Sequence, residues 1–269
     1  MEQKIYDIPQ PKDPNSTSDR FLAFIELVKV LRVGCPWDRK QTNESISHLL
    51  IEECYETLDA IKKKDDEEFS KELGDLLLHV VMHAVMADER GAFNLNDVIQ
   101  KIHDKLVFRH PHVFGEVVVS GEGEVLNNWE NLKKKEGRKN TLDGVPDSLP
   151  ALLRAERIQY KASRVGFDWE EKSGVWDKVE EELKELKVEI EAKNQEKIKE
   201  EFGDVFFALV NAARFEDVIP EVALQDTNDK FSRRFKYIED KAKEMSRELK
   251  DMTLGEMDEL WDEAKKLEK

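Results

Sequence analysis

The amino-acid sequence predicts an all-α protein made of two tandem helical modules. Apolar residues recur every three or four positions over long segments, and no window shows the period-two alternation that is typical of a β-strand. Charged residues make up 38% of the chain and hydrophobic residues 39%, with only 12 glycines and 8 prolines, which suits amphipathic helices. Residues 51–84 also match residues 180–213 at one constant offset. A repeat of that length indicates a duplicated module.

The first half of the chain is expected to contain a flexible leader and one module. Residues 1–18 are polar and proline-bearing, and the first module is expected over residues 19–116. Asp19 can cap the first helix of this module, and the GCPWD segment at 34–38 ends that helix. Helices are therefore expected over about residues 19–33, 45–63, 66–89 and, starting from Asn94 or Asn96, up to 110.

The second half repeats this organisation after a connector. Residues 117–150 combine glycines, prolines and mixed charges, which mark a linker, and Trp129 and Leu132 within it predict a short docked helix. The second module is expected over residues 151–269. Its helices are expected over about residues 151–163, 174–192, 195–215, 219–246 and 253–268.

Charge and composition exclude several classes of function. The net charge of −16 argues against a nucleic-acid partner, because phosphate backbones bind clustered lysine and arginine. No apolar run approaches the roughly 20 residues of a membrane helix, and the N-terminus lacks the apolar core of a signal peptide. Cys35 and Cys54 are too few for a disulfide framework. We therefore expect a soluble, cytoplasmic protein that binds neither nucleic acid nor membrane, which leaves a small phosphorylated ligand open.

Four acidic residues of the second module are placed so that they can meet. Glu182 and Glu185 lie three apart on one predicted helix and share a face, and Glu201 and Asp204 do the same on the next helix. Both pairs converge if these helices pack antiparallel through their apolar stripes. Gly203 costs roughly 1 kcal/mol relative to alanine in a helix, so we expect it to allow a close backbone approach there. The stripe of the second helix is predicted to contain Phe202, Val205, Phe206 and Leu209.

The first module carries the same acidic pattern, and the pattern predicts a metal site. Carboxylates without histidine or cysteine favour Mg²⁺ or Mn²⁺ over zinc, and Mg²⁺ usually completes its shell with water and phosphate oxygens. The alternative is that the acids are solvated helix faces, since 59 of the residues are acidic. The corresponding residues of the first module are Glu53, Glu56, Glu72 and Asp75, with Gly74 at the position of Gly203.

Basic residues further along the second module complete the predicted chemistry. Lys230 and Arg234 lie four apart on one helix, with Arg233 and Asn228 beside them. Acids that hold a metal, cations for phosphates and no evident covalent nucleophile indicate metal-assisted attack by water. The chain has no GxxxxGK[ST] motif, which excludes a P-loop enzyme.

Histidines and tryptophans outside this pattern are open to two interpretations. His79 and His83 have the four-residue spacing of some zinc ligands, but they lie in an apolar run, which favours core positions. Trp37 and Trp169 follow glycine-containing turns, where they either pack in the core or cover a bound base.

The motifs together resemble one known family. The acidic pairs, GCPWDRKQT (34–42), RHPHVFGE (109–116), the stretch at 143–169 and NDKFSRRF (228–235) resemble the MazG family of all-α nucleoside triphosphate pyrophosphohydrolases. The likeness extends over nearly the whole chain beyond the leader. It implies two MazG modules, each forming a four-helix-bundle-like unit that is completed by homodimerisation. It also implies Mg²⁺-dependent hydrolysis of nucleoside triphosphates to monophosphate and pyrophosphate, for nucleotide-pool house-cleaning or regulation.

The resemblance also assigns roles to residues of this chain. It implies that the second module is the main catalytic one and that Lys178, Asn228 and Arg233 contact the substrate. Lys230 and Arg234 would hold the phosphates and offset the charge of the leaving group, and Trp261 would stack on the nucleotide. Glu182 or Glu185 would orient the attacking water. The metal ligands would be Glu182, Glu185, Glu201 and Asp204, and in the first module Glu53, Glu56, Glu72 and Asp75.

The first module departs from the family pattern, and two alternative functions are open for the protein. The first module has HDKLVFRH where the second has NDKFSRRF, and Asn43 stands where the family usually shows histidine, which puts turnover by the first module in doubt. One alternative is a nucleotide-binding or dimerisation scaffold with weak catalysis. The other is a narrower pyrophosphohydrolase for dUTP, dCTP or phosphoribosyl-ATP.

Overall fold

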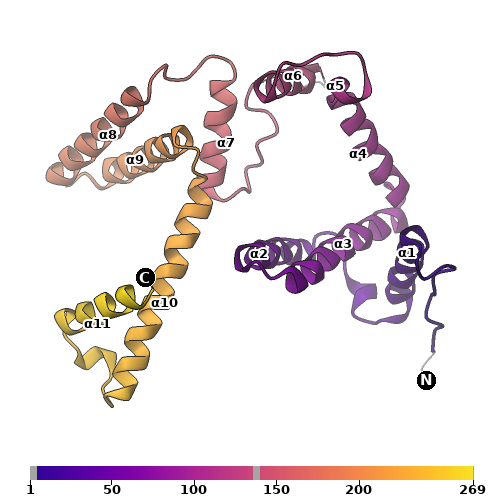
Figure 1. Ribbon diagram of the computed structural model, residues 1–269, viewed down its shortest axis with the longest axis horizontal. Coiled ribbons are helices and arrows are strands. Elements are labelled where there is room, and N and C mark those ends of the chain that lie inside the picture. Colours follow the sequence, from indigo (N-terminus) through magenta and orange to yellow (C-terminus); the bar gives the residue numbers. More distant parts are fainter. Residues whose placement is uncertain (1–4, 136–139, 269) are drawn as a thin grey trace. The chain divides into compact units, whose positions relative to one another are not determined.

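The computed structural model describes residues 5–135 and 140–268, and it confirms the predicted fold class. Within these residues all regular structure is helical, and there is no strand. The chain divides into two compact units, Met1–Val118 and Val119–Lys269, which we call the first and second unit (Figure 1). None of the helices in the described residues combines the length and apolar character needed to cross a membrane.

The helices of the first unit begin at clear capping residues. Ser16 caps α1 by accepting a hydrogen bond from the Asp19 amide, so the prediction that Asp19 is the cap was wrong by one turn. Asp65 caps α3, and Asn94 opens α4 in a capping box with Asp97. The bounds are α1 Thr17–Gly34, α2 Ser47–Lys63, α3 Asp66–Glu89, α4 Leu95–Arg109 and α5 Pro111–Phe114, with a 3₁₀ turn at Asp38–Lys40.

The core of the first unit lies between α1 and the α2–α3 hairpin. Lys64 adopts the left-handed conformation that ends α2 and turns the chain into α3. Arg32, which is only 8% exposed, donates to both carboxylate oxygens of Glu89 and to the carbonyls of Asp38 and Gln41. It thereby ties α1, α3 and the segment after α1 together. The buried apolar cluster comprises Val28, Ile46, Val81, Met82, Val85 and Met86.

The second unit repeats this arrangement and extends it. Its α7 packs against α9 as α1 packs against α3, and α8 and α9 form a hairpin whose turn contains left-handed Lys193. The predicted linker contains a longer helix, α6, than the short docked helix that we expected. The bounds are α6 Glu122–Lys135, α7 Ala151–Ser163, α8 Lys172–Ala192, α9 Gln195–Phe215, α10 Pro220–Glu244 and α11 Leu254–Leu267, with a 3₁₀ turn at Leu249–Asp251.

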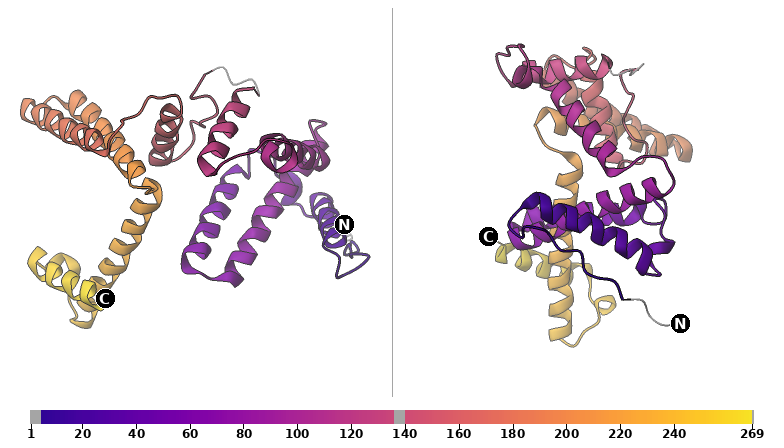
Figure 2. Two further views of the ribbon diagram at one scale, coloured as in Figure 1. Left: turned by 45° about the horizontal axis from the view of Figure 1, so that its top comes forward. Right: turned by 90° about the vertical axis from the view of Figure 1, so that its right-hand side faces the viewer.

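Two separate apolar clusters stabilise the second unit. One joins α8 and α9 through Val175, Val179, Ala208 and Ala212. The other joins α10 and α11 through Ile238, Ala242, Met252 and Leu260. Beyond its first turns α10 leads away from the α8–α9 hairpin and carries α11 at its far end (Figures 1 and 2).

Two sequence predictions about α9 were wrong. Phe202, Phe206 and Leu209 were expected to face α8, but they are 44%, 57% and 42% exposed. The hairpin instead closes over Val205 and the small Ala208, because small side chains allow close helix packing while the large ones stay outside. A Cβ added at Gly203 would meet nothing within 4 Å, so no close backbone approach requires this glycine in the described chain.

Candidate active site

Three glutamates of the second unit converge between α8 and α9. Glu182 and Glu185 project from α8 and Glu201 from α9, and each offers a carboxylate oxygen within 4.8 Å of the others. We call these residues the second triplet. Glu182 is only 6% exposed. Asp204 lies one helical turn beyond Glu201 and outside the triplet, but it borders the same cavity as Glu182.

The second triplet has the electrostatics of a cation site. Burial raises the pKa of Glu201, and the negative charges of Glu185, Asp204 and Glu182 raise it further. The Oε2 atom of Glu201 is buried and has no hydrogen-bond partner among the described residues. A buried carboxylate oxygen without a partner is costly unless a cation neutralises it. This all-oxygen donor set fits Mg²⁺ or Mn²⁺.

Lys178 is the cation already present beside the triplet. Its ammonium nitrogen lies 2.5 Å from Oε1 of Glu182 and 2.9 Å from Oε1 of Glu181. The hydrogen bond to Glu182 is the main reason that the pKa of Lys178 is raised. Lys178 therefore stays charged at neutral pH and offers hydrogen-bond donors to an anion that approaches Glu182.

A mostly apolar cavity of about 540 Å³ opens beside these charges. It lies among α7, α8, α9 and the segment before α8, within the size range of small-molecule sites. Lys178, Glu182 and Asp204 form its charged side. The apolar wall includes Leu142, Ile158, Ala162, Val165, Phe167, Trp169, Val175, Phe207 and Ala208.

Trp169 reaches the cavity because Gly174 lies in the first turn of α8, at the point of contact. A Cβ added at Gly174 would lie 2.5 Å from the indole ring, so only glycine leaves room for it. Trp169 is 43% exposed and lines the cavity. Of the two interpretations from sequence, this placement favours a wall next to a ligand over a core position.

Polar tethers hold the cavity walls in place, and the sequence reasoning missed them. Arg214 of α9 forms two hydrogen bonds, of 2.6 and 3.0 Å, to the carboxylate of Asp168 and one of 3.0 Å to Oδ1 of Asn211. Buried Lys161 donates to the carbonyls of Thr141 and Asp143. The sequence did contain a signal for Asn211 and Arg214, because these polar residues occupy positions on α9 where the helical period places core residues.

The basic residues of α10 lie apart from the triplet in this chain. Arg234 forms a 2.7 Å ion pair with Glu268 and stacks 5.4 Å from the ring centre of Trp261. Arg233 also pairs with Glu268, at 3.6 Å. Trp261 packs against Phe231 within the α10–α11 cluster. Within the described residues, neither arginine bonds to the acids of α8 and α9, and Asn228 and Lys230 lie on the same helix.

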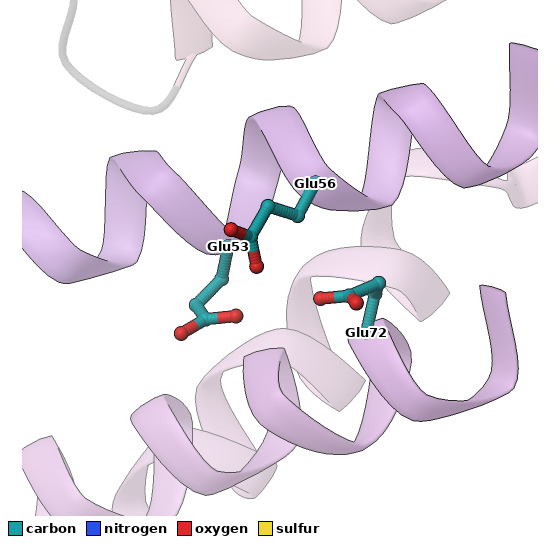
Figure 3. A group of neighbouring side chains, drawn as sticks. All are labelled: Glu53, Glu56 and Glu72. Carbon is teal, nitrogen blue, oxygen red and sulfur yellow. The ribbon is translucent and has the colours of Figure 1, made fainter. Parts of the chain in front are cut away.

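The first unit contains an equivalent group of acids. Glu53 and Glu56 project from α2 toward Glu72 of α3 (Figure 3), and their carboxylate oxygens also lie within 4.8 Å of one another. We call them the first triplet. Burial is the main cause of the raised pKa values of Glu53 and Glu72. Oε2 of Glu72 is buried without a hydrogen-bond partner in the described part of the chain. Asp75 again lies outside the triplet.

His79 and His83 lie on α3 next to the first triplet. Nε2 of His79 is 3.9 Å from Oε1 of Glu53, and the two imidazole centres are 5.9 Å apart. Asn43 donates to the His83 carbonyl at 3.0 Å, and its amide nitrogen lies 2.9 Å from Nδ1 of that ring. Burial lowers the pKa of both histidines, so they are neutral at pH 7.

Comparison with known proteins identifies the family. The profile of the MazG nucleotide pyrophosphohydrolase domain matches residues 41–114 and 172–238, which contain both triplets. The chain is 46% identical to the nucleoside triphosphate pyrophosphohydrolase/pyrophosphatase MazG of Thermotoga maritima, over 91% of this chain and 96% of that protein. It is 42% identical to the nucleoside triphosphate pyrophosphohydrolase of Escherichia coli K12, over 93% and 97%. It is also 50% identical to the uncharacterized protein YabN of Bacillus subtilis, over 97% of this chain but 55% of YabN.

Proposed function

This chain belongs to the MazG nucleotide pyrophosphohydrolase family, and on that premise we propose that its second unit hydrolyses nucleoside triphosphates to nucleoside monophosphates and pyrophosphate. One observation carries the proposal. The second triplet lies beside an apolar cavity that shares Glu182 with it. Phosphates and a cation fit the charged side, and a nucleoside fits the apolar side.

The acids of the second unit are proposed to hold Mg²⁺, with Mn²⁺ as the other candidate ion. The ligands would be the second triplet together with Asp204, and the unpartnered Oε2 of Glu201 supports this assignment. When bound, such an ion supplies Lewis-acid stabilisation of phosphate charge and lowers the pKa of a coordinated water.

The side chains of this unit have separate proposed roles. Glu182 or Glu185 accepts a hydrogen bond from the attacking water and orients it. The water oxygen bonds to the α-phosphorus and gives its proton to this carboxylate, the bond from the α-phosphorus to the bridging oxygen breaks, and pyrophosphate leaves with that oxygen. Lys178 donates hydrogen bonds to the phosphates from its place beside Glu182. Lys230 and Arg234 offset the charge of the pyrophosphate. Arg234 is paired with Glu268 in this structure, so a phosphate must displace Glu268 to bind it.

Homodimerisation is proposed to bury the large apolar side chains that one chain leaves exposed. Phe202, Phe206 and Leu209 form such a surface on α9, and Phe231 and Phe235 of α10 are 56% and 36% exposed. Exposed apolar surface of this extent on neighbouring helices is typical of subunit interfaces. Measurement of mass in solution tests this part, and a monomer at micromolar concentration would contradict it.

A product assay tests the activity. The purified full chain with Mg²⁺ and each common ribo- and deoxyribonucleoside triphosphate is expected to release pyrophosphate and monophosphate in equal amounts. Release of orthophosphate alone would overturn the proposal. Activity confined to one base would instead support the narrower pyrophosphohydrolase.

We further propose that the reaction serves cytoplasmic nucleotide-pool house-cleaning or regulation, which a comparison of nucleotide pools with and without the protein would test.

A further inference from the structure

Two carboxamide side chains are buried in the wall of the mostly apolar cavity. Asn211 of α9 is 4% exposed and Gln159 of α7 is 8% exposed, and both line the cavity. The proposed phosphate chemistry uses neither of them. Buried amides normally have hydrogen-bond partners for both ends, so the unused ends of these two side chains require an explanation.

Partners within the protein determine which end of each amide is free. Arg214 can only donate, so the end of Asn211 that it contacts at 3.0 Å is the oxygen, and the Nδ2 end is left without a partner among the described residues. The backbone carbonyl of Phe207 can only accept, so the end of Gln159 that contacts it at 2.7 Å is the nitrogen. Oε1 of Gln159 is buried and has no partner in the described part of the chain.

The fold itself does not require an amide at position 211. Under the internal repeat, Asn211 corresponds to Met82 of the first unit, which is 5% exposed and belongs to the apolar core. The same helical position is therefore filled by an apolar side chain in one unit and by an oriented hydrogen-bond donor in the other. Arg214, which is itself held by Asp168, fixes the orientation of this donor.

We propose that Asn211 and Gln159 bind the edge of the nucleobase, an inference that rests on the proposed function. Asn211 donates from Nδ2 to a ring nitrogen or carbonyl oxygen of the base, and Gln159 accepts at Oε1 from a base N–H. Phe167, Trp169 and Phe207 provide apolar surface for its faces. Purine and pyrimidine bases both carry hydrogen-bond donors and acceptors on one edge of the ring. The ligand class is therefore a nucleotide whose base has this edge free for hydrogen bonding. Base selectivity is decided at these two side chains.

The substitution Asn211→Asp tests this assignment with minimal change in shape. The carboxylate still accepts from Arg214, but the donor facing the cavity becomes an acceptor. We expect KM for nucleoside triphosphates to rise about tenfold or more, since a base acceptor then faces a carboxylate, and the order of preference among bases to change. Inhibition by inorganic tripolyphosphate, which has no base, should keep its inhibition constant. Gln159→Met should raise KM in the same way by removing the acceptor.

Matched measurements separate failure of this inference from failure of the proposed function. Met82→Leu at the corresponding position of the first unit is the control and should leave KM unchanged. Nucleotide affinity is measured by calorimetry alongside pyrophosphate release, so that binding is read without turnover. Unchanged affinity, KM and base preference in both folded variants would overturn the inference while pyrophosphate release by the unmodified chain upholds the function. An unmodified chain that releases no pyrophosphate would overturn the function.

Discussion

The two units share their acids and differ in the walls beside those acids. Both triplets place glutamate oxygens within 4.8 Å of one another, and both contain a buried oxygen without a partner in the described residues. Around them, side chains that line the cavity of the second unit correspond to core side chains of the first. Lys178, Asn211 and Arg214 line the cavity and correspond to Leu49, Met82 and Val85 of the apolar core, and Ala208 of the cavity wall corresponds to the buried His79.

We propose that this difference separates cation binding from nucleoside binding. In the first unit, apolar side chains and the larger imidazole of His79 occupy the positions of these cavity-lining residues. A cavity of about 420 Å³ beside the first triplet lies toward the α2–α3 turn instead. Its charged lining consists of Lys63, which is paired with Asp59, and the acids Glu56, Asp59, Asp65, Glu68 and Glu72. The net negative charge of this lining repels phosphates. We infer that the first unit binds a cation and supports assembly, while the second unit also binds the nucleotide.

Neutralising one acid in each unit gives the largest expected contrast. Glu201→Gln should lower the rate of pyrophosphate release by about a hundredfold or more, the order expected when an active site loses one electrostatic group. The fold should persist, because the substitution keeps the shape of the side chain and removes a buried charge. Glu72→Gln in the first unit is the matched control and should change the rate less than about twofold. Equal losses in both variants would contradict the division of roles.

Transferring a side chain from the first unit to the second should close the cavity. In Ala208→His the imidazole takes the place that His79 occupies in the first unit, and KM for nucleoside triphosphates should rise about tenfold because the ring fills space beside the base. Inhibition by tripolyphosphate should change little. Steady-state kinetics of this variant and of His79→Ala test the comparison. A larger effect of His79→Ala on KM would show that the nucleoside binds in the first unit.

Arg32 of the first unit, which ties α1 to α3, should affect stability more than activity. Arg32→Lys loses the paired bonds to Glu89 and the bonds to two carbonyls, which should cost about 2 kcal/mol of unfolding free energy. Arg214→Lys in the second unit should also raise KM, since Arg214 orients Asn211. Chemical denaturation and kinetics of both variants distinguish the two tethers. An unchanged KM in Arg214→Lys would remove the functional difference between them.

The smallest expected effect is a pH dependence of metal stabilisation. The raised pKa values of Glu201, Glu72 and Glu53 mean that the folded state binds these protons more tightly than the unfolded state. The contribution of these three carboxyls to the stability of the metal-free protein should therefore decrease as pH rises from the ordinary carboxyl pKa to their raised pKa values. Mg²⁺ competes with the protons, so its increase in Tm should be greater at about pH 8 than at about pH 5.

Single substitutions show how much each unit contributes to the pH-dependent increase in Tm caused by Mg²⁺. Thermal melts of Glu201→Gln should lose the contribution of the second unit, and those of Glu72→Gln the contribution of the first. An increase in Tm that is independent of pH would show that the ion binds elsewhere.

Local periodicity explains which features could be predicted from the sequence. The helical spacing placed Glu182 beside Glu185 and predicted an all-α fold with two related segments, and the structure confirms that fold. The roles assigned to Lys230, Arg234 and Trp261 stay predictions, and in this chain Arg234 contacts Glu268 and the ring of Trp261. The predicted stripe through Phe202 and Phe206 failed because periodicity does not say which apolar residues a single chain buries.

The sequence by itself determined the helices, their order and the two acids that share a face on each of two successive helices. These features depend on residues within three or four positions of one another. Only the tertiary structure decided that the second unit has an open cavity, since this depends on the packing of α7 on α9 and on the volumes of side chains far apart in the chain. It also decided the orientation of Asn211, which comes from Arg214 and, through it, from Asp168. Space and orientation are properties of long-range packing.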